Sequence, residues 1–196
     1  MKFLSFNYRG LASHPKKLAL KQLFRDNILD VIFLQETLGV GINITTVLNG
    51  MLSNWKICTI DGRGRSGCLA LGIILISLKI INTSRCDGIL VADVFSEELG
   101  MEIRLVNVYR PCGDTMALWN NLTNKSFMQY ANLVLGRDMN SSLGMSEIWG
   151  THTQHDHLSD FFLTRLNIIT LSILIFLIFF PPGGTDRHGI KHLLVG

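Results

Sequence analysis

The feature that most constrains the fold is a continuous apolar run at residues 31–34, Val-Ile-Phe-Leu, which ends in Gln35 and Glu36. A short run without polar alternation is typical of a strand that is buried on both faces. Such strands occur where a sheet is covered on both sides. The run therefore favours a layered α/β protein.

The segments around this run alternate between strand and helix patterns. Residues 1–6 alternate as a strand, and a helix is predicted from Pro15 to about Asp26 because its apolar residues recur at three- and four-residue spacing. Further along, we predict a helix at 42–52, a hairpin of strands at 55–60 and 69–81, a second hairpin at 89–95 and 101–109, a helix at 115–129 and a short strand at 132–138. This mixture predicts a four-layer α/β sandwich, in which two β-sheets pack together and helices cover the outside, although periodicity alone leaves a two-layer α+β domain open.

Length and composition indicate one folded domain. The chain has 196 residues, of which 17% are charged and 47% hydrophobic, so extensive disorder is excluded. The 4 cysteines are widely spaced without a Cys-x-x-Cys pair, so they are expected to be free thiols. No signal peptide precedes the first strand pattern, and the expected location is intracellular, nuclear or cytoplasmic.

Polar residues of a particular kind follow the apolar runs. Strand ends are where an α/β scaffold holds side chains rigidly enough to bind a metal ion and a phosphodiester. Taken singly, each residue also fits a structural role as a helix cap, a turn former or a strand aromatic, so the interpretation depends on the whole set. The set is Asn7, Glu36, Tyr109, Asp138 and Asn140.

Several short phrases, in their order along the chain, carry a resemblance to a known family. They are Phe6-Asn7-Tyr8-Arg9-Gly10-Leu11, Phe33-Leu34-Gln35-Glu36-Thr37, Gly64-Arg65-Ser66-Gly67-Cys68, Asn107-Val108-Tyr109, Gly136-Arg137-Asp138-Met139-Asn140 and Leu158-Ser159-Asp160-Phe161-Phe162. With them the chain resembles the endonuclease/exonuclease/phosphatase family, and specifically the endonuclease domain of plant LINE-type retrotransposons. The resemblance covers residues 1–166 and leaves 167–196 as a divergent, apolar and incomplete C-terminal segment.

The resemblance implies a role for each residue of the set. Glu36 would bind Mg²⁺ or Mn²⁺, and Asn7 would help to order the metal site and the phosphate. Asp138 would orient or deprotonate the attacking water, with support from Asn140. Tyr109 would contact the phosphate as charge develops. The implied activity is metal-dependent hydrolysis of DNA phosphodiesters.

Basic residues supply candidate contacts to DNA. The net charge of +3 permits a polyanionic partner without requiring one. Arg9, Arg63 and Arg65 are the candidates near the predicted site, and an early segment adds Lys16, Lys17, Lys21 and Arg25. A solvated helix face and a solvated turn are the structural alternatives.

The chain departs from the family pattern at several positions. Arg137, Arg110 and Cys68 stand where the family usually has glycine, and a larger residue is costly where φ is positive or where the backbone approaches a ligand. Lys191 stands where the family has an aspartate, and no Asp-His motif follows it. Impaired hydrolysis is therefore expected, and a non-catalytic remnant that at most binds nucleic acid is the alternative.

Two other features suggest rival functions. Residues 168–180 are almost wholly apolar, but the run is shorter than the roughly 20 residues of a spanning helix, so a buried strand is favoured over a membrane protein. A cluster at His152, His155, Asp156 and His157 could bind zinc, but its spacing does not match the helical His-Glu-x-x-His pattern. A loop near a nucleic-acid surface is the favoured interpretation of this cluster.

Overall fold

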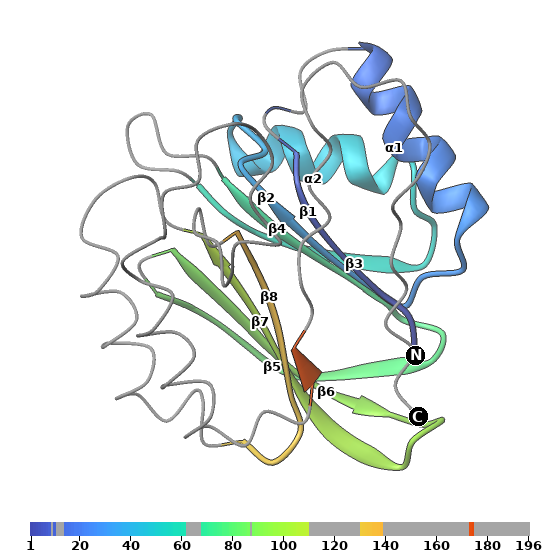
Figure 1. The fold of residues 1–196 in the computed structure, drawn as a ribbon, viewed down its shortest axis with the longest axis vertical. Coiled ribbons are helices and arrows are strands. Elements are labelled where there is room, and N and C mark those ends of the chain that lie inside the picture. The colour runs from blue at the N-terminus through green and yellow to red at the C-terminus, as the bar shows by residue number, and fades with distance from the viewer. Residues whose placement is uncertain are drawn as a thin grey trace, which may run out of the picture.

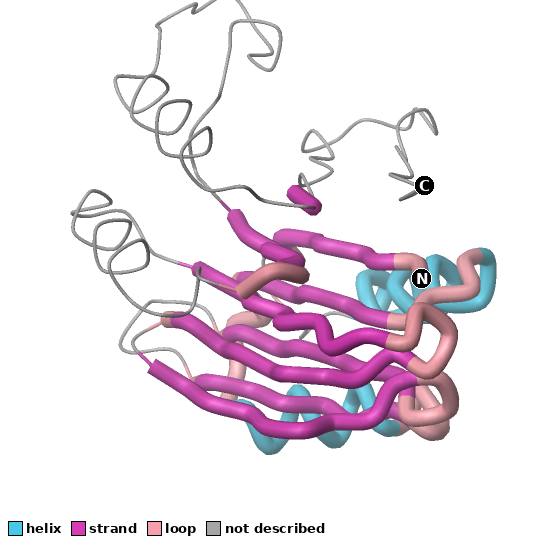
Figure 2. The backbone as a smooth tube through the Cα atoms, turned by 90° about the horizontal axis from the view of Figure 1, so that it is seen from below, coloured by secondary structure: helices cyan, strands magenta, loops and turns pink. Residues whose placement is uncertain are grey.

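Two β-sheets pack face to face, and two helices cover the outer face of the first sheet (Figure 1). The computed structural model describes residues 1–8, 10, 14–61, 68–86, 88–109, 130–138 and 173–174. In Figure 2 the strands of both sheets run in similar directions, with the helices outside them.

The first sheet combines parallel and antiparallel strands. Its order is β1-β2-β4-β3, in which β1 and β2 are parallel and β4 is antiparallel to both of its neighbours. Helix α1 (His14–Asp26) connects β1 to β2, and α2 (Gly41–Asn49) connects β2 to β3. The strands are β1 (Phe3–Asn7), β2 (Val31–Gln35), β3 (Trp55–Ile60) and β4 (Leu69–Ile74).

The second sheet has the order β5-β6-β7-β8-β9. Antiparallel pairing joins β5, β6 and β7, whereas β8 is parallel to both β7 and β9. The strands are β5 (Leu78–Cys86), β6 (Ile89–Ser96), β7 (Met101–Tyr109), β8 (Leu133–Asp138) and β9 (Ile173–Leu174). Strand β9 comes from the apolar run at 168–180, for which the sequence favours a strand.

Strand β2 divides the hydrophobic core into two layers. Val31 and Phe33 face the second sheet, and Ile32 and Leu34 face the helices. All four side chains are fully buried, as the unbroken apolar run predicts. This strand is therefore the centre of the fold.

The outer face of the second sheet is buried as well. Four apolar side chains of this face lie outside both core clusters and are at most 3% exposed, namely Val91, Val106, Leu133 and Leu135. The central strands of both sheets are thus buried on both faces, whereas β5 is largely exposed. The predicted sandwich of two packed sheets with outer cover is confirmed.

Two predicted elements differ in their bounds. The single strand predicted at 69–81 is wrong, because a turn at 75–77 splits it into β4 and β5, which belong to different sheets. The backbone N–H of Leu75 donates to the carbonyl oxygen of Asn54 at 2.8 Å, which fixes this turn. Apolar character continues through the turn, where Ile76 is 70% exposed, so hydropathy alone does not reveal the break.

Helix α2 ends earlier than the predicted bound of 52. It ends at Asn49, and the N–H of Gly50 donates to the carbonyl oxygen of Thr46 at 3.1 Å. The predicted helix at 115–129 lies outside the described residues. Within the described ranges, none of the helices is long and apolar enough to cross a membrane.

Candidate active site

Asn7 and Glu36 lie at the C-terminal ends of two neighbouring strands of the first sheet. Strands β1 and β2 are parallel, and Asn7 is the register partner of Gln35, so Asn7 and Glu36 lie at adjacent strand ends. Both residues are partly exposed, unlike the buried residues before Glu36. The metal-binding role predicted for Glu36 and Asn7 stays a prediction.

The backbone on either side of this edge is tied together by hydrogen bonds. The N–H of Tyr8 donates to the Gln35 carbonyl at 2.9 Å, and the N–H of Gly10 donates to the Glu36 carbonyl at 2.8 Å. The pairing of β1 with β2 thus continues past the strand ends. Gly10 has φ = +100°, a conformation that glycine adopts without steric penalty.

Glu36 adopts a left-handed backbone conformation, with φ = 51°. This conformation costs a non-glycine residue on the order of 1 kcal/mol or more, and it persists where the surrounding structure enforces it. Here Thr37 enforces it, because its N–H and its hydroxyl donate to the Cys68 carbonyl at 3.1 and 2.9 Å. Backbone strain at a metal-capable carboxylate is an observation that points to function.

Cys68 is accommodated beside this turn. Its side chain is 1% exposed, and burial raises the pKa of its thiol. Cys68 is not among the described non-glycine residues with positive φ. The cysteine, which stands where the resemblance predicts glycine, therefore causes no left-handed backbone strain.

Tyr109 and Asp138 lie at the C-terminal ends of two neighbouring strands of the second sheet. Strands β7 and β8 are parallel, and the two residues are register partners at the ends of their strands. Tyr109 is 8% exposed and belongs to the core between the sheets. For Asp138 the structure describes the backbone position, and its side chain lies outside the described part.

A buried polar network connects the two sheets one step below this edge. The Asn107 side-chain amide donates to the carbonyl oxygens of Leu34 at 3.2 Å and Ala70 at 2.8 Å. Its side-chain oxygen accepts from Gln35 Nε2 at 2.7 Å. Gln35 Nε2 also lies 3.3 Å from Ser5 Oγ. Asn107 and Gln35 are fully buried, so their hydrogen bonds lie in the interior, where unpaired polar groups are costly.

The network fixes which way each amide points. Asn107 must direct its NH₂ at the two backbone carbonyls, which leaves its oxygen for Gln35 and requires the Gln35 NH₂ to face it. Gln35 Oε1 is consequently a buried acceptor that has no hydrogen-bond partner within the described part of the chain. Gln35 directly precedes Glu36, so its side-chain oxygen remains able to accept a hydrogen bond next to the candidate metal ligand.

Gly136 allows β8 to approach β2. A Cβ atom at this position would lie 2.5 Å from Phe33 Cβ, a distance that real Cβ contacts do not reach. Phe33 is fully buried between the sheets. The absence of a side chain at Gly136 thus sets the sheet separation two residues before Asp138.

The structure does not describe the remaining predicted residues. Arg9, Asn140, Arg63 and Arg65 lie outside the described residues, so their assignments stay predictions. The same holds for Arg110 and for the histidine cluster at 152–157. Among the residues that are described, no group of three or more His, Cys, Asp or Glu side chains forms a metal cluster.

Sequence reasoning assigned no role to Asn107, Gln35 or Gly136. Two of them had a visible signal, because Asn107 interrupts an apolar strand pattern and Gln35 precedes the acidic residue at a strand end. A polar residue at an inward position of a strand indicates a buried hydrogen-bond partner. The identity of that partner depends on how the two sheets are aligned, which periodicity does not provide.

The arrangement suits binding of an anionic ester. A carboxylate and a carboxamide at one sheet edge provide hard oxygen ligands, and a phenol with a neighbouring carboxylate lies at the edge of the sheet packed against it. The first pair is chemically suited to a divalent cation such as Mg²⁺. The second pair is suited to contact with a phosphate and an attacking water.

Solved structures share this arrangement of packed sheets. They include humanized D. rerio TDP2 (TM-score 0.59, 14% identity, 72% of this chain and 63% of that chain). They also include the endonuclease domain of TRAS1, a telomere-specific non-LTR retrotransposon (TM-score 0.61, 16% identity, 86% and 71%). An endonuclease/exonuclease/phosphatase family protein from Bacteroides thetaiotaomicron matches with a TM-score of 0.58 at 12% identity, over 84% and 68% of the two chains.

The chain has the endonuclease/exonuclease/phosphatase fold. This fold is a four-layer α/β sandwich, so the fold class and the resemblance predicted from the sequence are confirmed at the level of structure. The matched part of the chain spans 63% of the TDP2 structure, which is less than two thirds of it. No family sequence profile and no curated protein sequence matches the chain.

Proposed function

We propose that the chain is a divalent-metal-dependent phosphodiester hydrolase of the endonuclease type, impaired in activity, that acts on DNA inside the cell, in the nucleus or the cytoplasm. The observation that carries the proposal is the pairing at two strand edges, Asn7 beside Glu36 and Tyr109 beside Asp138. The shared fold supports it, and so does the single-strand DNA product bound in another D. rerio TDP2 structure. The TRAS1 likeness supports an origin in a LINE-type retrotransposon.

The residues present fit a hard divalent cation. Glu36 and Asn7 supply oxygen donors at adjacent strand ends, which is the donor chemistry that Mg²⁺ and Mn²⁺ accept. When bound, such a cation neutralises charge on the phosphate and polarises it toward attack. The left-handed turn at Glu36 orients the carboxylate before any ligand binds, because Thr37 and Gly10 hold the backbone on both sides.

The second pair acts on the attacking water and the phosphate. Asp138 accepts a proton from the water or orients it, with Asn140 as its support. The Tyr109 hydroxyl donates a hydrogen bond to a phosphate oxygen as negative charge grows in the transition state. The buried network of Asn107 and Gln35 keeps the two pairs at a fixed separation, so that both can reach one phosphodiester.

We further propose that residues 1–166 form the hydrolase domain and that 167–196 is a divergent segment appended to it. Strand β9 within that segment pairs in parallel with β8, with Ile173 beside Val134 and Leu174 beside Leu135. The segment thus supplies an edge strand to the sheet that carries Asp138. A strand in that place supports β8 without adding a residue to the proposed site.

Nicking of supercoiled plasmid tests the proposal. Wild-type protein is expected to nick with Mg²⁺ and to stop when a chelator is added, and Asp138→Ala purified identically is expected to lose at least about a hundredfold in rate. Glu97→Gln is the matched control, because Glu97 is an exposed partner of Lys79 on the second sheet, away from the site. Salt-sensitive DNA binding by folded protein without any nicking would contradict the hydrolase and support a nucleic-acid-binding remnant.

A further inference from the structure

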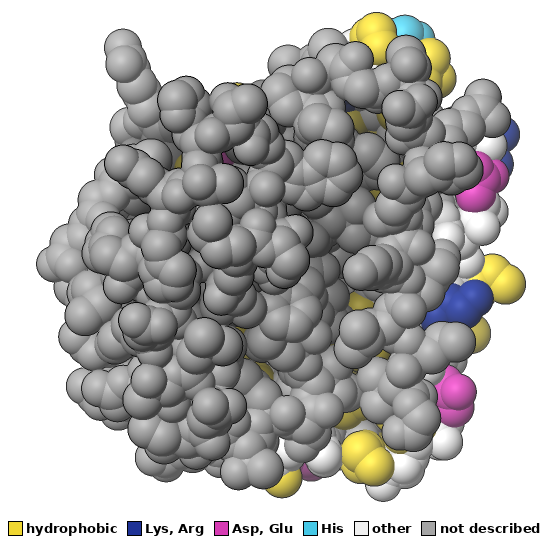
Figure 3. Space-filling view, in the orientation of Figure 1, with side chains coloured by type: hydrophobic (Ala, Val, Ile, Leu, Met, Phe, Trp, Pro, Cys, Tyr) yellow, Lys and Arg dark blue, Asp and Glu magenta, His cyan; other side chains and the backbone are white. Residues whose placement is uncertain are grey.

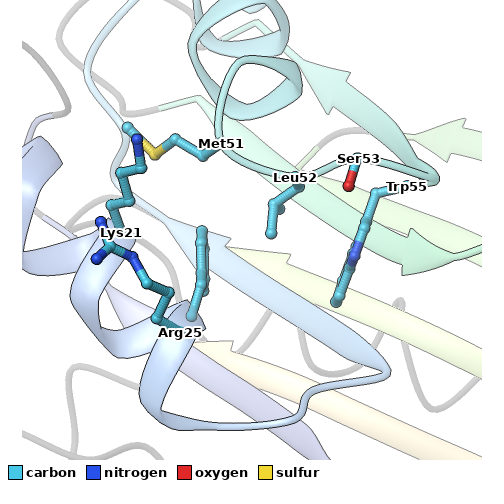
Figure 4. Close-up of a pocket in the computed structure, with 7 residues that line it drawn as sticks. Lys21, Arg25, Met51, Leu52, Ser53 and Trp55 are labelled. Atoms are coloured by element: carbon cyan, nitrogen blue, oxygen red, sulfur yellow. The ribbon is translucent and has the colours of Figure 1, made fainter.

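A groove lies at the opposite end of the strands of the first sheet from Asn7 and Glu36. We call it the α1–β3 groove, and it runs between the last turn of α1 and the segment from Met51 to Trp55 (Figure 4). Two adjoining cavities of about 170 and 220 Å³ form it, and both are lined by Phe24, Arg25, Leu52 and Trp55. Ile74 lines the second cavity. It pairs with Trp55, and its neighbour Ile73 pairs with Val31 at the start of β2. The groove therefore lies at the opposite end of the strands from Glu36.

The lining of this groove is aromatic at its floor and cationic at its rim. Phe24 and Trp55 are partly exposed rings, and in Figure 4 Lys21 and Arg25 stand on the α1 side of the groove. Both cations are exposed. Among the described residues, no aspartate or glutamate lines either cavity, and the nearby Asp26 accepts from Gln22 Nε2 at 2.8 Å. Flat rings beside exposed positive charge suit a ligand that is both planar and anionic.

A row of cations extends from this groove along α1. Lys17, Lys21 and Arg25 are four residues apart, so they share one side of the helix at intervals of about 6 Å. Helix α1 has no acidic residue in its first turn. At that end Lys16 Nζ lies 3.5 Å from the Tyr8 carbonyl oxygen, which adjoins Asn7. Lys16 and Lys17 thus lie at the end of α1 nearer to Asn7, and Arg25 lies at the groove. Figure 3 shows isolated dark-blue side chains at the right-hand rim of this face.

We propose that the α1–β3 groove binds single-stranded nucleic acid, with a base stacked on Trp55 and Phe24 and successive phosphates along Lys17, Lys21 and Arg25. A repeating anion matches a repeating row of cations, and every base has a flat face for the rings. An acidic peptide would satisfy the charges but would leave the aromatic floor without a planar partner. Binding at the groove does not require hydrolysis. The inference rests on the proposed function only in its biological role, which is to hold the nucleic-acid strand that extends from the proposed active site.

Fluorescence anisotropy of a labelled oligothymidylate, with chelator present, tests the groove independently of hydrolysis. Neutralising two cations in Lys21→Gln/Arg25→Gln is expected to reduce the slope of log affinity against log salt by about 1.4, since each single-strand phosphate contact contributes about 0.7. Trp55→Ala is expected to weaken binding about fivefold or more, and Trp55→Phe is expected to retain most of the affinity. The matched control is Lys79→Gln/Arg85→Gln, which removes two exposed cations from β5 in the other sheet and should leave affinity nearly unchanged.

The outcomes separate this inference from the proposed function. Equal salt slopes for the groove variant and its control would overturn the groove, even if the protein nicks plasmid. Displacement of the oligonucleotide by oligoglutamate at comparable concentration would overturn it as well, because the ligand would then be any acidic chain. A selective loss in the groove variant supports it, even if no nicking occurs. Urea unfolding of each variant checks the fold, and the lysine-arginine pair carries the test if Trp55→Ala fails to fold.

Discussion

Removal of the Asn107 side chain tests whether the buried network holds the two sheets together. The side chain is 0% exposed and makes contacts to the Leu34 and Ala70 carbonyls and to Gln35 Nε2. In Asn107→Ala these three buried groups lose their partner. An unsatisfied buried group costs about 1–3 kcal/mol, but the Gln35 amide retains Ser5 Oγ and strand carbonyls can share other bonds. We therefore expect a loss of about 2–5 kcal/mol in unfolding free energy.

A second variant separates the hydrogen bonds from the volume of the side chain. Asn107→Asp keeps the shape but replaces the amide donor by an oxygen, which would face two carbonyl oxygens in the interior. At neutral pH its loss of stability should equal or exceed that of Asn107→Ala, because a buried charge without a cationic partner is added. Domains of this size have only about 5–15 kcal/mol in total, so both variants should be visibly destabilised.

Urea denaturation followed by circular dichroism measures these losses. The control is Asn82→Ala, which removes an exposed asparagine from β5 and should change stability by no more than about 0.5 kcal/mol. If Asn107→Ala were as stable as Asn82→Ala, the network would contribute nothing measurable to stability and could not be what aligns the two sheets.

Two further predictions concern packing and pH. Gly136→Ala should lose at least about 1–3 kcal/mol in unfolding free energy, because its Cβ would meet Phe33 Cβ at 2.5 Å. Gly50→Ala, whose Cβ would have ordinary contacts at 3.5 Å, should be tolerated and is the control. Equal urea midpoints for the two variants would contradict the close approach. Burial raises the pKa of Tyr8 to about 12, and its hydroxyl has no hydrogen-bond partner among the described residues. The neutral phenol is thus favoured in the folded state, so its contribution to stability should be retained below pH 10 and lost as the pH rises toward 12. Tyr8→Phe should remove this alkaline loss and be neutral or stabilising at neutral pH. An unchanged alkaline stability profile in Tyr8→Phe would contradict this role of Tyr8.

The sequence predicts the parts of the fold that depend on local pattern. The apolar run at 31–34 identifies β2 and its burial on both faces, and the polar residues after the runs identify the sheet edges. Asn7 ends a strand that is parallel to β2, and Tyr109 ends a strand that is parallel to β8. Once this topology is known, Asn7 must lie near Glu36 and Tyr109 near Asp138. These are the relations that strand order and direction determine.

Features that depend on the contact between the sheets could not be predicted. Asn107 acts through carbonyls of Leu34 and Ala70, far away in the sequence, and Gly136 is required only because Phe33 stands opposite it. The change of sheet at residues 75–77 occurs within an apolar stretch and leaves no hydropathic signal. Each of these is a tertiary property, since it depends on which surfaces meet.

The central claim is that Glu36 from the first sheet and Asp138 from the second act on one phosphodiester. A double-mutant cycle on the rate of Mg²⁺-dependent plasmid nicking tests it most directly, with Glu36→Gln, Asp138→Asn and the double variant. We predict that each single variant loses about a hundredfold or more and that the double variant loses far less than the product of the two, because residues that act as a unit are not additive. Nicking that persists in both single variants, or losses that simply multiply, would contradict a shared site.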